Sequence, residues 1–244
     1  MTIQPEAATH ALANTDSELS SLLVTWQNPE SRRYYLMGTL QKTEKKYRFA
    51  YYPKVELEPG FRMLPGFRDS SKTYEASVLF PLFSSRLMST KRSDRPDWLH
   101  SFDLDESATA LEILSRSLGR RVGDNIELLP EPHIDFVNRR VWGQTPIHGL
   151  RYKTDGQQMI AHGALKRGDK LTVTLETTNP GDHRARLVCT TQGVELGYLP
   201  RPLLDYLDGL GYLNGVPEAT VEFVNPDRYE IHQQVQITYS WQIG

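Results

Sequence analysis

The chain has 244 residues, of which 39% are hydrophobic and 24% are charged, and its formal net charge at pH 7 is −2. These values are typical of a globular protein with enough apolar material for a core. The slightly negative charge argues against a protein that coats DNA regardless of sequence, because such proteins usually have a basic surface. The charge does not exclude a small site that binds one end of a DNA strand and contacts few phosphates.

The single cysteine, Cys189, cannot form a disulfide within the chain, which indicates a reducing compartment. No apolar run reaches the ~18 residues typical of a transmembrane helix. The N-terminus lacks the charged and apolar regions of a signal peptide. We therefore expect a cytoplasmic protein with no membrane partner.

The first half of the chain is predicted to be rich in β-strands. Residues 1–21 lack apolar periodicity, which indicates a flexible arm. Apolar runs predict strands at residues 22–26, 34–40, 46–52 and 126–130. Residues 105–118 place several leucines on one face and are followed by Gly119, which predicts a helix with Asp105 as its N-cap.

Short motifs in residues 22–131 resemble the N-terminal subdomain of HipA-type toxin kinases. They are Val24–Trp26, Gly38–Leu40, Tyr47–Tyr51 and Leu128–Glu131. No kinase lobe follows, since the chain has no glycine-rich phosphate loop, no pairing of a strand lysine with a helix glutamate, and no catalytic Asp with a downstream Asn. We expect this half to contact a protein partner instead, with Trp98 and Phe102 as candidate anchors.

Prolines punctuate residues 132–146, which predicts a linker, and residues 147–244 are expected to form a second domain. Strands are predicted at 147–153, 163–176, 185–190, 196–199, 219–224 and 231–243, with one helix at 202–208. Short strands separated by turns predict a small barrel. The expected fold class is mainly β with a few helices (α+β), in two small β-rich domains.

Two segments of the second domain are candidate parts of a binding site. Residues 179–182, Asn-Pro-Gly-Asp, form a strong turn signal because Asn and Asp bond their own backbone and Pro fixes φ. Residues 197–201, Gly-Tyr-Leu-Pro-Arg, indicate a strand that runs into a helix with Pro202 in its first turn. A tight polar turn beside such a corner is a natural rim for a small pocket.

Together with Gly149–Tyr152, these segments resemble the HIRAN domain over about residues 147–242, in order and in spacing. The resemblance implies a small β-barrel module that binds single-stranded DNA, in particular its 3′ end. It also implies that Tyr152 stacks on a base while Arg151 meets a phosphate. The alternative for this pair is a core aromatic with a surface arginine.

The resemblance further implies that Asn179 and Asp182 contact the terminal nucleotide, with the Asp182 carboxylate accepting a hydrogen bond from a free 3′-OH. The alternative is an Asx turn that binds nothing. Tyr198 is expected to form one wall of the pocket. Gly181 replaces an aromatic residue of eukaryotic relatives, so binding should be weak to moderate.

Arg184 and Arg201 are expected to line a phosphate path, although a solvated basic face is the alternative. Neither metal-ligand spacing nor a nucleophile elbow is present, so we expect no enzyme, metal or cofactor. The leading hypothesis is a bacterial accessory protein of DNA repair or phage defence that binds single-stranded DNA or DNA ends and contacts a helicase or nuclease. The alternative is a regulatory, antitoxin-like subunit of a HipA-like kinase that does not bind DNA.

Overall fold

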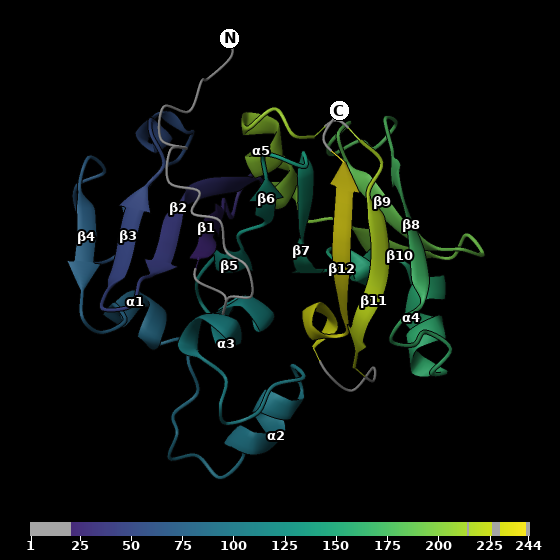
Figure 1. The fold of residues 1–244 in the computed structure, drawn as a ribbon, viewed down its shortest axis with the longest axis horizontal. Helices are drawn as coiled ribbons and strands as arrows, with labels where there is room; N and C mark the ends of the chain where they lie inside the picture. The colour runs from purple at the N-terminus through teal and green to yellow at the C-terminus, as the bar shows by residue number, and fades with distance from the viewer. Residues whose placement is uncertain (1–20, 214, 226–229, 243–244) are drawn as a thin grey trace. The chain divides into compact units, whose positions relative to one another are not determined.

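The computed structural model describes residues 21–213, 215–225 and 230–242, so the predicted arm at residues 1–21 lies almost entirely outside the described residues. The chain divides into two compact units, with the division between Glu131 and Pro132. Each is built around one antiparallel sheet, so the predicted fold class of two β-rich parts with a few helices is confirmed (Figure 1). No helix in the described part of the chain is long and apolar enough to cross a membrane.

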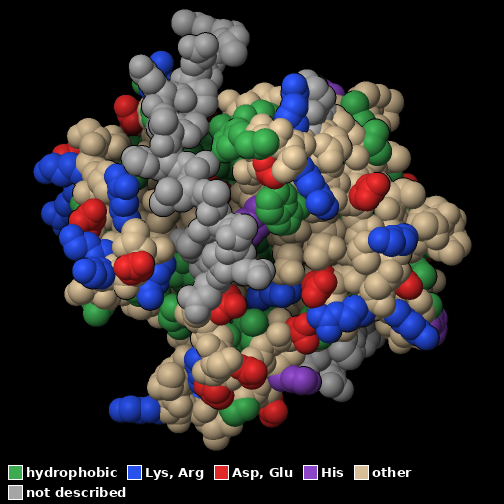
Figure 2. Space-filling model, in the orientation of Figure 1, with side chains coloured by type: hydrophobic (Ala, Val, Ile, Leu, Met, Phe, Trp, Pro, Cys, Tyr) green, Lys and Arg blue, Asp and Glu red, His purple; other side chains and the backbone are tan. Residues whose placement is uncertain are grey.

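The first unit contains a five-stranded sheet in the order β4-β3-β2-β1-β5. Its strands are β1 (Ser21–Gln27), β2 (Tyr34–Lys42), β3 (Tyr47–Tyr51), β4 (Thr73–Ala76) and β5 (Ile126–Pro130). Aromatic packing dominates the core, where the rings of Phe49, Phe67 and Phe83 form a triangle with centres 4.4 to 5.8 Å apart. Figure 2 shows Lys and Arg side chains gathered over β3 and β4, with acidic side chains among them. Lys46 Nζ, just before β3, lies 2.8 Å from Glu75 Oε2 on β4.

Three helices and one 3₁₀ turn complete the first unit. They are η1 (Val55–Leu57), α1 (Pro81–Ser84), α2 (Arg95–His100) and α3 (Ala110–Arg116). The predicted helix at 105–118 is shorter, and its N-cap is Thr109 rather than Asp105. Thr109 forms a capping box with Glu112, while the Asp105 carboxylate instead accepts hydrogen bonds from Ser107.

The second unit contains a seven-stranded sheet in the order β10-β9-β8-β11-β12-β7-β6. Its strands are β6 (His133–Asp135), β7 (Arg140–Pro146), β8 (Lys170–Leu175), β9 (Arg186–Thr190), β10 (Glu195–Tyr198), β11 (Glu218–Val224) and β12 (Val235–Gln242). The helices are α4 (Thr154–Ala161) and α5 (Arg201–Gly209), with 3₁₀ turns η2 (Leu150–Tyr152) and η3 (Ile231–Gln233). Leu203 and Leu207 of α5 pack against Val141, Tyr239 and Trp241 on one face of this sheet.

Residues 132–146, expected to form a linker, belong instead to the second sheet. β7 pairs with β12 along its whole length, and β6 pairs with β7. The prolines that suggested a linker flank this hairpin: Pro132 precedes β6, and Pro146 ends β7. Proline is tolerated at such positions because a strand end lacks one ladder hydrogen bond anyway.

The second sheet does not close into the barrel that was expected. Its edges are β10 and β6. The chain that leaves β7 nevertheless reaches β10 through an isolated bridge, in which His148 and Tyr198 exchange backbone hydrogen bonds of 2.9 and 2.8 Å. This bridge brings residues 148–153 against the end of β10.

A fragment of residues 132–244 should unfold cooperatively, because it keeps every strand of its sheet. A fragment of residues 147–244 should melt at a lower temperature, since it loses the β7 partner of β12 and the buried side chain of Val141. Thermal denaturation followed by circular dichroism compares the two, and equal melting temperatures would contradict this assignment of β7.

Candidate functional site

Arg151 and Tyr152 lie in the 3₁₀ turn η2, where a strand start was expected. Gly149, with φ of +77°, turns the chain out of the bridge, and Tyr152 N donates to Gly149 O at 3.0 Å. The turn leaves the Tyr152 side chain 71% exposed, so the alternative of a core aromatic is wrong. The Arg151 guanidinium lies 4.7 Å from the centre of the Tyr152 ring, and this cation–π pair presents an aromatic ring and a positive charge to solvent.

Tyr198, at the end of β10, is half-buried and held on several sides. Lys153 Nζ lies 4.8 Å from the centre of its ring and donates to its hydroxyl at 3.1 Å. The same ammonium group donates to Glu195 Oε2 at 2.5 Å. The lysine and the His148 bridge therefore fix the ring close to the chain that carries Arg151 and Tyr152.

The turn at residues 179–182 is an Asx turn, as its sequence predicts. Asn179 Oδ1 accepts from the backbone N–H of Gly181 at 3.0 Å and of Asp182 at 3.1 Å. Its Nδ2 donates to Glu176 Oε2 at 2.6 Å. The pKa of Glu176 is lowered, first by this hydrogen bond and then by one from the Tyr198 hydroxyl. Asn179 and Tyr198 thus both lower the pKa of this carboxyl group.

Asp182 belongs to a network of charges that extends to α5. Its carboxylate lies 3.6 Å from both Arg184 Nε and Arg201 Nε and accepts from the Arg184 backbone N–H at 3.0 Å. Arg184 also donates to Asp205 at 2.5 Å and to Asp208 at 2.7 Å. Burial raises the pKa of Asp205, although the neighbouring arginines oppose this.

This network includes two arginines that were expected to line a phosphate path. The guanidinium of Arg184 is occupied by aspartates, and that of Arg201 lies 3.6 Å from both Asp182 and Asp205 and donates to Gly181 O at 3.3 Å. Both arginines are therefore paired with aspartates within the protein, and their expected place on a phosphate path stays a prediction. In the structure, the arginines brace the turn against the start of α5.

Sequence reasoning missed Lys153, Glu176 and Glu195, the charged residues that connect the turn to Tyr198. The signal for Lys153 was its position directly after Arg151 and Tyr152. Glu195 carries no local signal, because its partner Lys153 is 42 residues away, whereas Glu176 lies only three residues before Asn179. Among the described residues, no group of three or more side chains is arranged to hold a metal ion.

A pH prediction follows from the lowered pKa of Glu176. A carboxyl group whose pKa is lower in the folded state than in the unfolded state stabilises the folded state at pH values above its ordinary pKa of 4.5. This stabilisation is lost as the pH falls through the lowered pKa of the folded state. The NMR signals of the Asn179 side-chain amide should therefore shift with a midpoint below 4.5. Glu176→Gln should remove this titration, and a midpoint above the ordinary value would contradict the hydrogen-bonded carboxylate.

The two candidate anchors of the first unit differ in exposure. Phe102 is only 2% exposed, so its predicted role as a direct partner contact is wrong. It follows α2 in the chain and packs at 5.3 Å, edge to face, against Trp98, which is half-buried. Of the two side chains, Trp98 is the one with solvent-exposed surface that a partner could contact.

The family model of the HIRAN domain matches residues 143–240 of this chain. The match contains all seven residues that were expected to bind DNA. Two solved structures are similar at 19% identity: a protein from Lactobacillus plantarum (TM-score 0.32, covering 43% of this chain and 99% of that one) and the HIRAN domain of human HLTF (TM-score 0.29, covering 42% and 74%). No curated protein matches.

Proposed function

We propose that the HIRAN-like unit binds single-stranded DNA at a 3′ end, with Tyr152 as the stacking platform. The observation that carries this proposal is the exposed pair of Arg151 and Tyr152 beside the immobilised ring of Tyr198. Unpaired bases stack on aromatic rings regardless of their identity, and an adjacent arginine meets the phosphate.

The Asx turn supports a preference for a strand end. Its backbone N–H groups at residues 181 and 182 are already satisfied by Asn179, while the carboxylates of Glu176 and Asp182 lie beside it. Carboxylates can accept a hydrogen bond from a free hydroxyl, and they repel a phosphate at the same place. A free 3′-OH is therefore favoured over a phosphorylated end.

Fluorescence anisotropy with labelled oligonucleotides tests this function. The protein should bind a single strand with a 3′-OH more tightly than the same strand with a 3′-phosphate, and more tightly than blunt duplex DNA. Because the site offers few cations that are not already paired, the slope of log K against log[salt] should be shallow, about −0.7 to −1.4 for one or two phosphates. Equal affinity for both strand ends would overturn the end preference, and no binding at low salt would overturn the function.

For residues 21–131 we propose a protein-contact role, which rests on the resemblance of several short motifs to the N-terminal subdomain of HipA-type kinases. Exposed apolar side chains support it, among them Leu57 at 74% and Val78 at 71%. Co-expression with candidate kinase, helicase or nuclease partners, followed by gel filtration, tests it. A partner that binds residues 132–244 alone would contradict this assignment.

A further inference from the structure

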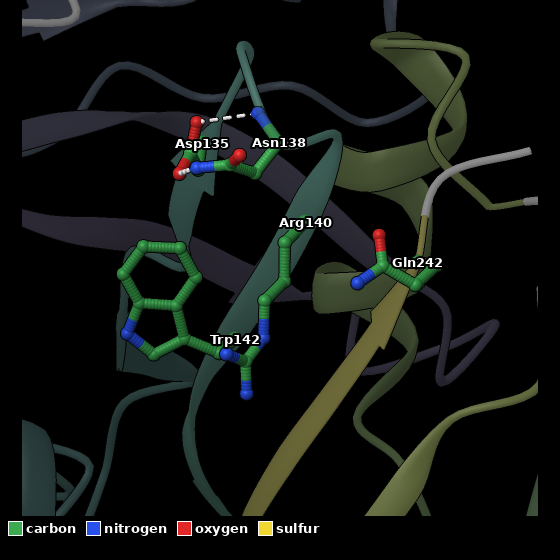
Figure 3. Close-up of a pocket in the computed structure, with 5 residues that line it drawn as sticks. All are labelled: Asp135, Asn138, Arg140, Trp142 and Gln242. Atoms are coloured by element: carbon green, nitrogen blue, oxygen red, sulfur yellow. Dashed lines mark hydrogen bonds between the residues drawn. The ribbon is translucent and has the colours of Figure 1, made fainter.

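A pocket of about 370 Å³ lies in the second unit, where the β6–β7 hairpin meets the end of β12 (Figure 3). It is lined by Asp135, Asn138, Arg140, Trp142 and Gln242. Arg140 pairs in register with Asp135 on β6 and with Gln242 on β12, so three strands bring these groups together. All five residues lie outside residues 143–240, the range that the family model matches.

The pocket has an aromatic wall that is fixed in place. His133 stacks on Trp142 with ring centres 5.3 Å apart and planes 16° apart. The two residues are direct partners across β6 and β7, which holds the stack in register. A ring that is already immobilised stacks on an unpaired base with little further loss of side-chain freedom.

Arg140 supplies hydrogen-bond donors to the pocket. Its guanidinium lies 5.8 Å from the centre of the Trp142 ring and makes no hydrogen bond or ion pair with any other residue that the structure describes. Arg140 is exposed, so its side chain can move against a ligand that enters beside the indole. Its planar fork suits a ligand with two neighbouring acceptors.

The remaining polar groups supply acceptors. Asp135 Oδ2 accepts from Asn138 Nδ2 at 2.6 Å, and Asp135 Oδ1 accepts from the backbone N–H groups of Val137 and Asn138. The Gln242 amide is satisfied when its nitrogen donates to the carbonyls of Asn138 and Arg139 at 3.1 Å each. The amide nitrogens of Asn138 and Gln242 thus donate within the protein, so the oxygens of these two amides are the groups left to act as acceptors toward a ligand.

We propose that this pocket holds an unpaired guanine of the single strand whose 3′ end lies at Tyr152, an inference that rests on the proposed function. Guanine presents O6 and N7 as paired acceptors for an arginine, and its N1–H and N2–H₂ groups as donors for amide oxygens. Adenine and cytosine each place an amino donor where Arg140 would approach. Trp142 and His148 are six residues apart along one extended segment, or about 20 Å, so several nucleotides separate the pocket from the strand end.

The test uses the full chain and oligothymidine strands that carry one guanine, moved stepwise away from the 3′ end. At the matching position the guanine should tighten binding by about 5- to 150-fold, the range for one bidentate base contact. Arg140→Gln should abolish this gain, and Arg140→Lys, which keeps the charge but not the fork, should lose most of it. Lys166→Gln, an exposed cation before β8, is the charge-matched control and should retain the gain.

The outcomes of these experiments distinguish a failure of this inference from a failure of the proposed function. If strands bind in a Tyr152-dependent manner but no guanine position is preferred, or if Arg140→Gln keeps the preference, the inference is overturned and the function stands. If no strand binds, both are overturned. Guanosine monophosphate should compete only at far higher concentration than the strand. Equal competition would assign the pocket to a free nucleotide and overturn the inference.

Discussion

Tyr152→Ala is expected to weaken the binding of single-stranded DNA by about 1–3 kcal/mol, the range for stacking one base on an aromatic side chain. Tyr152 is 71% exposed and its ring lies against the Arg151 guanidinium, so the substitution should leave the melting temperature nearly unchanged. Its effect on affinity therefore reports on DNA contact rather than on folding.

Two companion variants sharpen this test. Tyr152→Phe keeps the ring and should retain most of the affinity. Arg151→Gln should reduce the salt slope by about 0.7, the value for one phosphate of a single strand. Anisotropy titrations at several salt concentrations measure both. If Tyr152→Ala binds as well as the unmodified protein, the stacking platform lies elsewhere.

Gly197→Ala is expected to destabilise the second unit by about 2–5 kcal/mol, because it combines backbone strain with overpacking. Gly197 has φ of +144°, a conformation that residues with a side chain rarely adopt. A Cβ at this position would lie 2.3 Å from His148 O and 2.6 Å from Ile147 Cγ2. The carbonyl cannot move aside without opening the bridge between His148 and Tyr198.

Chemical denaturation measures this loss, and DNA binding should fall with it because the bridge positions both tyrosines. Gly209→Ala is the matched control: nothing lies within 4 Å of its added carbon, and it sits at the end of α5. The control should be neutral or slightly stabilising. Equal stability of the two variants would contradict the close approach of β10 to residue 148.

Turn chemistry and apolar alternation located much of the second sheet from the sequence. The strands expected at 185–190, 196–199 and 219–224 correspond to β9, β10 and β11, and the helix at 202–208 corresponds to α5. Helix α4 was missed because its sequence is mostly polar and buries only Gly156 and Ile160. A Cβ on Gly156 would lie 2.6 Å from Glu195 O, so this glycine allows helix and strand to approach closely, a tertiary reason that the sequence does not reveal.

The candidate site was predictable to the extent that its contacts are local. The Asx turn follows from the order of Asn, Pro, Gly and Asp, and the structure contains it. The ion pairing of Arg184 does not follow, because its partners Asp205 and Asp208 lie more than 20 residues away. Whether an arginine is free for a phosphate depends on the side chains that the fold places beside it.

Only Glu131 and Pro132 separate β5 from β6. This short connection limits the distance between a ligand bound to the first unit and a ligand bound to the second. Three residue steps span at most about 11 Å, so Pro130 and His133 stay within that distance whatever orientation the units adopt. A protein held by the first unit would therefore meet a DNA end held by the second at a high effective concentration, in the millimolar range for short connections. An enzyme with weak affinity for DNA ends would gain its substrate by tethering alone.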